Sequence, residues 1–287
     1  MSVVDKVIFC EGKQTSFDIK LLERVLEPGQ GPTIVPASGK FSFSPFAQGY
    51  LSHDKAVNKR YIIFRDRDFD VEPTSDGKLL PLKLIKHCFL TNRACIENYL
   101  LDANLIHKYW HAMFEKSENP LFKWGHGNSP GIEKIAEWID GAARELKDYQ
   151  AVRWALADVA KPSGARSHLK TTWTKGSGKL PASLGLPHCQ AEAKKLIQTF
   201  REAVDQVTQD KFEESLGIYQ DKFSQDEFWQ HKQYIIWFHG KDLQKAMQRQ
   251  KSQYISLKEN FCNWAIEQLD ITQYPDLTEL RTKIENL

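Results

Sequence analysis

The chain has 287 residues, a length that predicts about two domains of roughly 150 residues each. Hydrophobic residues make up 41% of it and charged residues 26%, as in globular proteins with a buried core, which excludes a wholly disordered chain. The 39 Lys and Arg residues nearly balance the 37 Asp and Glu residues. This balance excludes a histone-like polycation but allows a local basic patch.

The sequence indicates a cytoplasmic protein without a membrane span. Apolar runs stay shorter than the ~18 residues of a spanning helix, and the first residues lack the pattern of a signal peptide. The five cysteines are an odd number, are widely spaced and form no CxxC motif. Reduced thiols in the cytoplasm are the simplest explanation of this pattern.

The first part of the chain, residues 1–116, alternates strand and helix patterns. Strands are predicted at residues 7–10, 33–35, 61–64 and 82–89, and helices at residues 17–26 and 96–114. The run at 61–64 is apolar on both faces, which favours a central parallel strand. This alternation predicts an α/β fold with a mostly parallel sheet flanked by helices.

The second part of the chain is predicted to be mainly α-helical. Pro and Gly residues between positions 117 and 130 indicate a linker. Residues 131–287 then show helical periodicity, and we expect them to contact the substrate, a second copy of the chain or a partner. Near the end, Asp276 and Glu279 have the spacing of a capping box before the last helix.

Acidic side chains follow two of the predicted strands. Glu11 and Gly12 come directly after strand 7–10, and Asp66 and Asp68 follow strand 61–64. Because ligands of open parallel sheets bind beyond the carboxyl ends of the strands, we expect the three carboxylates to lie together. In extended backbone Asp66 and Asp68 point the same way, which predicts a bracket for Mg²⁺ or Mn²⁺. Gly12 would let a phosphate or the metal approach the backbone.

A plainer interpretation of the DxD sequence is a surface turn in which Arg65 and Arg67 neutralise the acids. The Glu-Gly pair after a second strand makes the metal site the better hypothesis. Asp70 is a weaker metal candidate, and a solvated turn residue is the better interpretation of it.

Two segments resemble the motifs of the TOPRIM fold, namely residues 7–13 (VIFCEGK) and residues 62–68 (IIFRDRD). That Rossmann-like fold is shared by topoisomerases, bacterial primases, small ribosomal-RNA maturases and overcoming-lysogenization-defect nucleases. The resemblance implies that Glu11 is a general acid or base or a metal ligand. It also implies that Asp66 and Asp68 hold the Mg²⁺ ion.

A third segment, residues 91–101 (TNRACIENYLL), resembles a TOPRIM-like family that accompanies ABC-type ATPases in bacterial anti-phage systems, among them the effector subunit of the PARIS system. Residues 237–243 (WFHGKDL) resemble the distal Gly-Lys motif of that family. The resemblance implies that Glu97 is a further acidic group near the metal, the alternative being a helix-start Glu stabilised by the helix dipole. Lys13 is expected to contact the scissile phosphate, the alternative being an ordinary exposed Lys.

The segment from residue 159 to residue 191 is basic and contains no acidic residue. Its candidate nucleic-acid contacts are Lys161, Arg166, Lys170, Trp173, Lys175 and Lys179. Cations follow phosphates and a Trp stacks on a base, but a solvated loop or a docking surface for an acidic partner would have the same composition. The Gly176 to Lys179 sequence lacks the Ser or Thr of a P-loop, so an ATP dependence must come from a partner.

Two further patterns have structural explanations. His107 and His111 have zinc-compatible spacing but no third ligand, so we expect ordinary core or surface histidines. The aromatic segment 228–238 (FWQHKQYIIWF) is typical of a core or of a protein interface. A homodimer or an ATPase partner would use such an interface.

The favoured hypothesis is a Mg²⁺-dependent TOPRIM endonuclease of the bacterial cytoplasm. The family resemblance implies a toxin-like effector that a partner ABC-type ATPase releases on infection, with RNA, and tRNA in particular, favoured over DNA as the substrate. One alternative is a DNA nickase or nuclease of the overcoming-lysogenization-defect type. Another is a non-catalytic TOPRIM adaptor of the ATPase.

Overall fold

The chain forms two compact units. The computed structural model describes residues 6–26, 31–37, 60–82, 85, 87–118, 124–161, 169, 171–174, 176–201 and 207–287. The first unit draws on residues 1–67, 73–100 and 259–287, and the second on residues 68–72 and 101–258. Within the described residues, no helix is long and apolar enough to cross a membrane.

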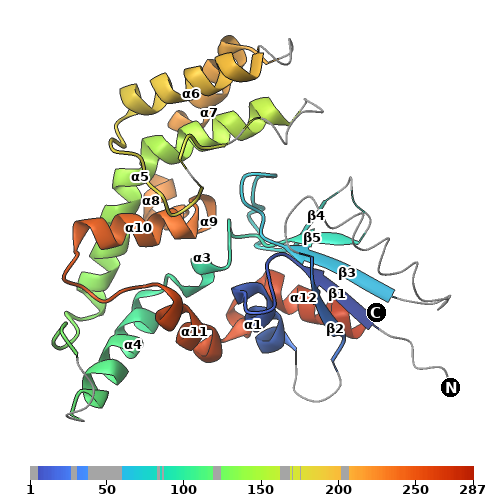
Figure 1. The fold of residues 1–287 in the computed structure, drawn as a ribbon, viewed down its shortest axis with the longest axis vertical. Helices are drawn as coiled ribbons and strands as arrows, with labels where there is room; N and C mark the ends of the chain where they lie inside the picture. Colours follow the sequence, from blue (N-terminus) through green and yellow to red (C-terminus); the bar gives the residue numbers. More distant parts are fainter. Residues whose placement is uncertain are drawn as a thin grey trace. The chain divides into compact units, whose positions relative to one another are not determined.

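The first unit is built on a five-stranded sheet with the strand order β2-β1-β3-β5-β4 (Figure 1). The strands are β1 (Lys6–Cys10), β2 (Thr33–Pro36), β3 (Arg60–Arg65), β4 (Leu80–Pro81) and β5 (Cys88–Leu90). Pairing is parallel from β2 to β5, and β4 is antiparallel at one edge. The predicted α/β class with a mostly parallel sheet is therefore confirmed. The central strand is β3, as its apolar sequence predicts.

Helices from both ends of the chain complete the first unit. They are α1 (Phe17–Val25), α3 (Glu97–Leu100), α11 (Glu259–Gln268), the short η1 (Ile271–Gln273) and α12 (Pro275–Glu285). Helix α1 packs against α11 and α12 (Figure 1). Arg24 Nε donates to the carbonyl of Leu269 at 3.0 Å, and Arg281 Nε donates to that of Val25 at 2.7 Å.

The compact units thus divide the chain differently from the predicted domains at residues 1–116 and 131–287. The last helices belong with the sheet, because their apolar side chains, such as Phe261 and Leu280, are buried there. Helical periodicity shows that a helix buries one face, but it does not identify the element that covers that face.

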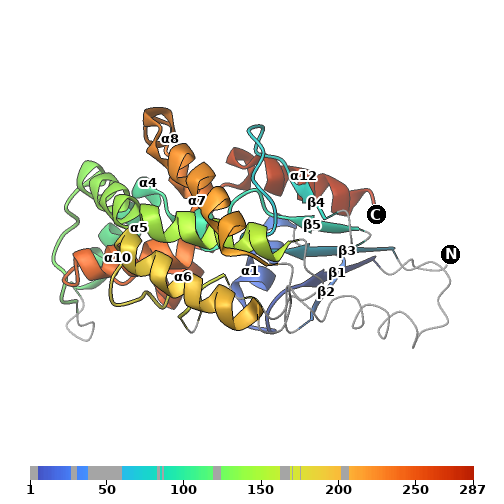
Figure 2. The same ribbon diagram turned by 90° about the horizontal axis from the view of Figure 1, so that it is seen from above.

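The second unit is mainly helical. Its helices are α4 (Ala103–Lys116), α5 (Ile132–Ala160), α6 (Leu186–Arg201), α7 (Gln209–Ser224), α8 (Asp226–Gln230), α9 (Tyr234–Trp237) and α10 (Gly240–Gln250). The long α5 runs through this unit, and α4, α6, α7 and α10 all pack against it (Figure 2). Tyr234 and Phe238 of the aromatic segment are buried, which favours its interpretation as core.

Candidate functional site

The carboxyl ends of β1 and β3 form a topological switch point. The two strands are parallel neighbours, with Cys10 opposite Phe64. The strand that follows β1 along the chain, β2, pairs with β1 on one side. Strand β3 pairs with β1 on the other side, and β5 pairs with the far side of β3. Open α/β sheets bind ligands at such a point. Glu11 directly follows β1 and Asp66 directly follows β3, so the prediction that they share this edge is confirmed.

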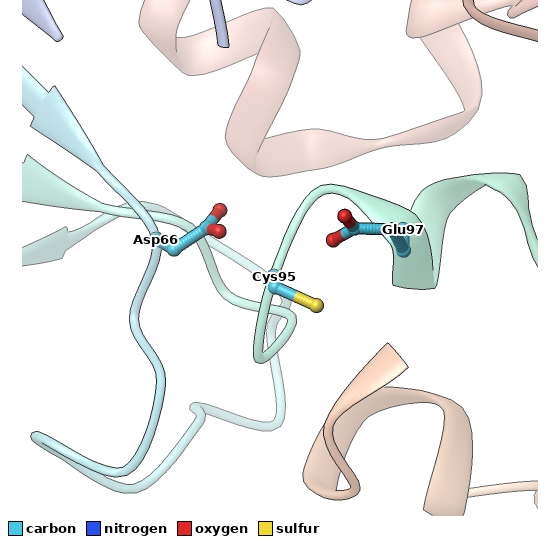
Figure 3. Close-up of side chains that lie close together, drawn as sticks. All are labelled: Asp66, Cys95 and Glu97. Carbon is cyan, nitrogen blue, oxygen red and sulfur yellow. The ribbon is translucent and has the colours of Figure 1, made fainter. Parts of the chain in front are cut away.

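Asp66, Cys95 and Glu97 form the side-chain cluster at this edge. One ligand atom from each residue lies within 4.8 Å of the ligand atoms of the other two. Asp66 is half-buried, and Cys95 and Glu97 are buried. In Figure 3 the carboxylates of Asp66 and Glu97 point toward each other. Like charges this close repel each other, and a divalent cation would remove that repulsion.

The turn between β5 and α3 brings Glu97 to Asp66. The backbone N–H of Ile96 donates to Asp66 Oδ1 at 3.1 Å, which joins the carboxylate to the turn. Asn98 Oδ1 accepts the backbone N–H of Cys95 at 3.0 Å and the thiol of Cys95 at 3.1 Å. Thr91 Oγ1 accepts the backbone N–H of Arg67 at 3.0 Å. These bonds hold residues 91–98 in the turn from which Glu97 faces Asp66.

Asp276 holds the same turn from the C-terminal helix. Its carboxylate accepts the backbone N–H of Asn92 at 2.8 Å and also accepts the hydroxyl of Tyr99. Burial raises the pKa of the Asp276 carboxyl, and burial together with the nearby Asp276 charge raises the pKa of Tyr99. Asp276 is 2% exposed. The helix begins after Tyr274, which makes no side-chain cap hydrogen bond, so the predicted capping role of Asp276 is wrong. Its carboxylate holds residues 92–99 instead.

Sequence reasoning missed both Asp276 and Cys95 as members of this site. Asp276 lies 177 positions from its partner Tyr99, and periodicity carries no signal for such a pair. Cys95 stands inside the TNRACIENYLL segment, but one thiol there has no distinguishing pattern.

The loop after β1 carries Glu11 in a turn that requires Gly12. Gly12 has φ +96°, and a Cβ at this position would lie 2.6 Å from Ser16 Oγ. Close approach of a phosphate or a metal is the expected reason for Gly12. The turn itself is a second reason, because its backbone conformation requires a glycine. Lys13 is exposed, which a phosphate contact requires. The burial of Cys10, aided by the charges of Asp18 and Glu11, raises the pKa of its thiol to about 12.

Asp68 belongs to the second unit and departs from the predicted geometry. Its φ is +51°, so Asp68 does not have the extended backbone on which the expected common direction of Asp66 and Asp68 depends. Left-handed backbone is tolerated by Asp better than by most residues. His239 Nε2 lies 3.3 Å from Asp68 Oδ1. Asp70 lies in a bend, as expected, but is buried rather than solvated.

Arg65 and Arg67 do not form the exposed surface turn of the alternative interpretation. They are 3% and 0% exposed. Arg67 Nε donates to the carbonyl of Asn92 at 3.0 Å. At least one of the two guanidinium groups therefore supports the turn that carries Glu97.

The basic segment is only partly described, since Arg166, Lys170 and Lys175 lie outside the described residues. Lys161 Nζ lies 2.5 Å from Asp158 Oδ1, so its charge has an acidic partner just upstream of the segment. Trp173 is half-buried and packs edge-on against Tyr149, with ring centroids 5.3 Å apart. Lys179 is exposed. Of the described candidates, Lys179 has the surroundings best suited to contact a phosphate.

The histidine pair is accounted for by local contacts. His107 Nδ1 lies 2.7 Å from Ser129 Oγ, and His111 Nδ1 lies 3.3 Å from Glu115 Oε1. These contacts agree with the interpretation as ordinary structural histidines.

In comparisons with known proteins, no family model and no curated protein matches this chain.

Proposed function

We propose that this chain is a divalent-metal-dependent endonuclease of the TOPRIM type. The observation that carries the proposal is the convergence of Asp66 and Glu97 at the switch point, where Glu11 also follows its strand. Mg²⁺ and Mn²⁺ take oxygen ligands in proteins, and one or two carboxylates are a common set of protein ligands for them. The fit to a divalent metal is therefore good.

Asp66 and Glu97 would hold the metal, together with Glu11 and with Asp68, the second acid of the DxD sequence. When bound, the metal supplies charge stabilisation to a phosphate undergoing transfer. The chain's own contribution is positioning. The Ile96 N–H fixes the Asp66 carboxylate, the Glu11 carboxylate takes the proton of the attacking oxygen or shares the metal, and Lys13 Nζ contacts the scissile phosphate.

We propose RNA, and tRNA in particular, as the substrate. The support is the resemblance to the anti-phage family, whose toxin-like effectors accompany an ABC-type ATPase. On that basis the partner ATPase holds the enzyme inactive in the bacterial cytoplasm until infection. Lys179, which is exposed on the basic segment, is the candidate for contact with the RNA backbone.

Cleavage assays on purified protein test this proposal. Total tRNA and supercoiled plasmid are incubated separately with Mg²⁺, with Mn²⁺ and with EDTA. The site variants are Asp66→Asn and Glu97→Gln, which keep size and remove charge. The matched controls are Asp140→Asn and Glu115→Gln, because both acids lie on exposed helix faces with their own basic partners.

We expect discrete tRNA fragments that disappear with EDTA and with either site variant but persist in both controls. Plasmid nicking with the same dependence, and intact tRNA, would replace this proposal with the DNA nuclease. If neither substrate is cut, the assay is repeated in cells that also express the ATPase. Toxicity there that survives both site variants would establish the non-catalytic adaptor instead.

A further inference from the structure

The segment Asp68–Glu72 is anchored inside the helical unit from both ends. Near its start, the Phe69 ring packs edge-on against Trp154 with centroids 5.2 Å apart, and the guanidinium of Arg153 lies 4.2 Å from its centroid. At its end, Glu72 accepts the hydroxyl of Tyr219 at 3.1 Å. Backbone in an uncommon conformation persists where its surroundings fix it. These anchors hold Asp68 at its φ of +51°.

His239 contacts the Asp68 carboxylate directly. The imidazole is 2% exposed and stacks on Phe69 with centroids 6.0 Å apart. Its Nε2 lies 3.3 Å from Asp68 Oδ1. Because an ionised carboxylate only accepts hydrogen bonds, Nε2 carries the proton and donates it. The ring therefore gives Asp68 a preferred orientation.

A buried hydrogen-bond network fixes His239 from behind. Gln150 Oε1 accepts the backbone N–H of His239 at 3.1 Å, and Gln150 Nε2 donates to Asp242 Oδ2 at 2.9 Å. The Asp242 carboxylate is paired with Arg153. Burial alone would raise the pKa of Asp242, but the charges of Arg153 and His239 and hydrogen bonds from its neighbours hold that pKa below its usual range. Asp242 therefore stays ionised, and its ion pair with Arg153 holds the hydrogen-bond network in place.

We propose that His239 is a positioning residue that orients Asp68 for metal binding, with Gln150 and the Arg153–Asp242 pair holding the imidazole in place. This inference rests on the proposed function, in which Asp68 is a metal-binding carboxylate. Carboxylates that bind metals are themselves hydrogen-bonded, and loss of such a partner typically lowers metal affinity or activity about 10–100-fold. The positioning role of His239 also accounts for the histidine and the aspartate that flank the Gly-Lys pair in WFHGKDL.

The test compares two substitutions of His239 in the full chain. His239→Phe keeps a flat ring against Phe69 and removes the donor. His239→Gln places an amide N–H near the position of Nε2 and restores the donor. His231→Phe is the matched control, because His231 is an exposed histidine that lies outside WFHGKDL. Mn²⁺ binding is measured by calorimetry without substrate, and half-saturating Mn²⁺ is measured in the tRNA cleavage assay.

We expect His239→Phe to weaken Mn²⁺ binding about 10–100-fold, His239→Gln to recover most of that loss, and His231→Phe to bind as the wild type does. Wild-type affinity in His239→Phe would overturn the positioning role and leave the proposed function intact. Equal weakening in His239→Phe and His239→Gln, with equally lowered melting temperatures, would reduce His239 to a packing residue and overturn the role. A wild-type protein that binds no Mn²⁺ would refute the proposed function itself.

Discussion

The two units differ in the charged side chains that they bring together: an acid and a base in the helical unit, and two acids in the sheet unit. In the helical unit, Asp242 is fully buried beside Arg153, so each charge stabilises the other. In the sheet unit, Asp66 and Glu97 approach within 4.8 Å although both are acids. A buried pair of opposite charges is a structural element. Two like charges brought together repel each other, and a cation between them would remove that repulsion, so the acidic pair is the better candidate for a functional site.

The largest expected effect comes from breaking the pair of opposite charges. Removing one partner of a buried ion pair leaves an uncompensated charge, so Asp242→Ala should lower the free energy of unfolding by about 3–5 kcal/mol. Urea unfolding followed by tryptophan fluorescence measures this, because every tryptophan except Trp264 lies in the helical unit.

The double variant Arg153→Met with Asp242→Leu is the control for this prediction. Replacing both charges with apolar side chains of similar size is often neutral for stability, so it should recover much of the loss. A single variant as stable as the wild type would show that the pair carries no structural role, and the contrast between the units would disappear.

A smaller effect is expected from the glycine beside Glu11. Gly12→Ala places a Cβ at left-handed φ and 2.6 Å from Ser16, which should destabilise the protein by about 1–3 kcal/mol. Gly217→Ala is the matched control, because no atom lies within 4 Å of the added Cβ in helix α7. That change should stabilise the protein by about 0.5–1 kcal/mol. The same sign for both substitutions in thermal unfolding would contradict this account of the turn.

The smallest effect is a pH dependence with opposite signs in the two units. Burial raises the pKa of Asp276 above its unfolded value near 3.8, so the folded state binds more protons and stability falls as pH rises from about 4 through the raised pKa. The pKa of Asp242 is lowered from the same value, so its contribution is present above pH ~4 and is lost as pH falls through the lowered pKa.

Unfolding measured between pH 3 and pH 7 checks these signs against Asp276→Asn. The wild type should be more stable relative to this variant at the acid end and should lose that advantage toward neutral pH, by at most about 1.4 kcal/mol per pH unit. A constant difference across the range would show that Asp276 does not titrate differently in the folded state.

Strand patterns and the parallel-edge rule were sufficient to predict the sheet and the placement of Glu11 and Asp66. Apolar runs such as the one at 61–64 reflect burial on both faces, and the edge follows from parallel pairing alone. The position of the last two helices could not be predicted in this way, because periodicity does not identify the partner of a helix face.

Side-chain geometry within the site was predicted less well. The DxD spacing suggested extended backbone, but Asp68 is left-handed and contacts His239, 171 positions away. A family resemblance, and not the spacing of Glu97 in the sequence, predicts that Glu97 lies near the metal. Contacts at such separations depend on tertiary packing, which no local pattern encodes.

Metal-dependent stability is the most direct test of the claim that Asp66 and Glu97 form a cation site. Thermal unfolding is followed for the wild type, Glu97→Gln and the exposed-site control Glu115→Gln, with and without Mn²⁺. At a Mn²⁺ concentration 100 times the dissociation constant, the wild type and the control should gain about 2.7 kcal/mol. Glu97→Gln should gain much less from the metal than the wild type does. Equal stabilisation of Glu97→Gln and the wild type, or no stabilisation of either, would contradict the claim.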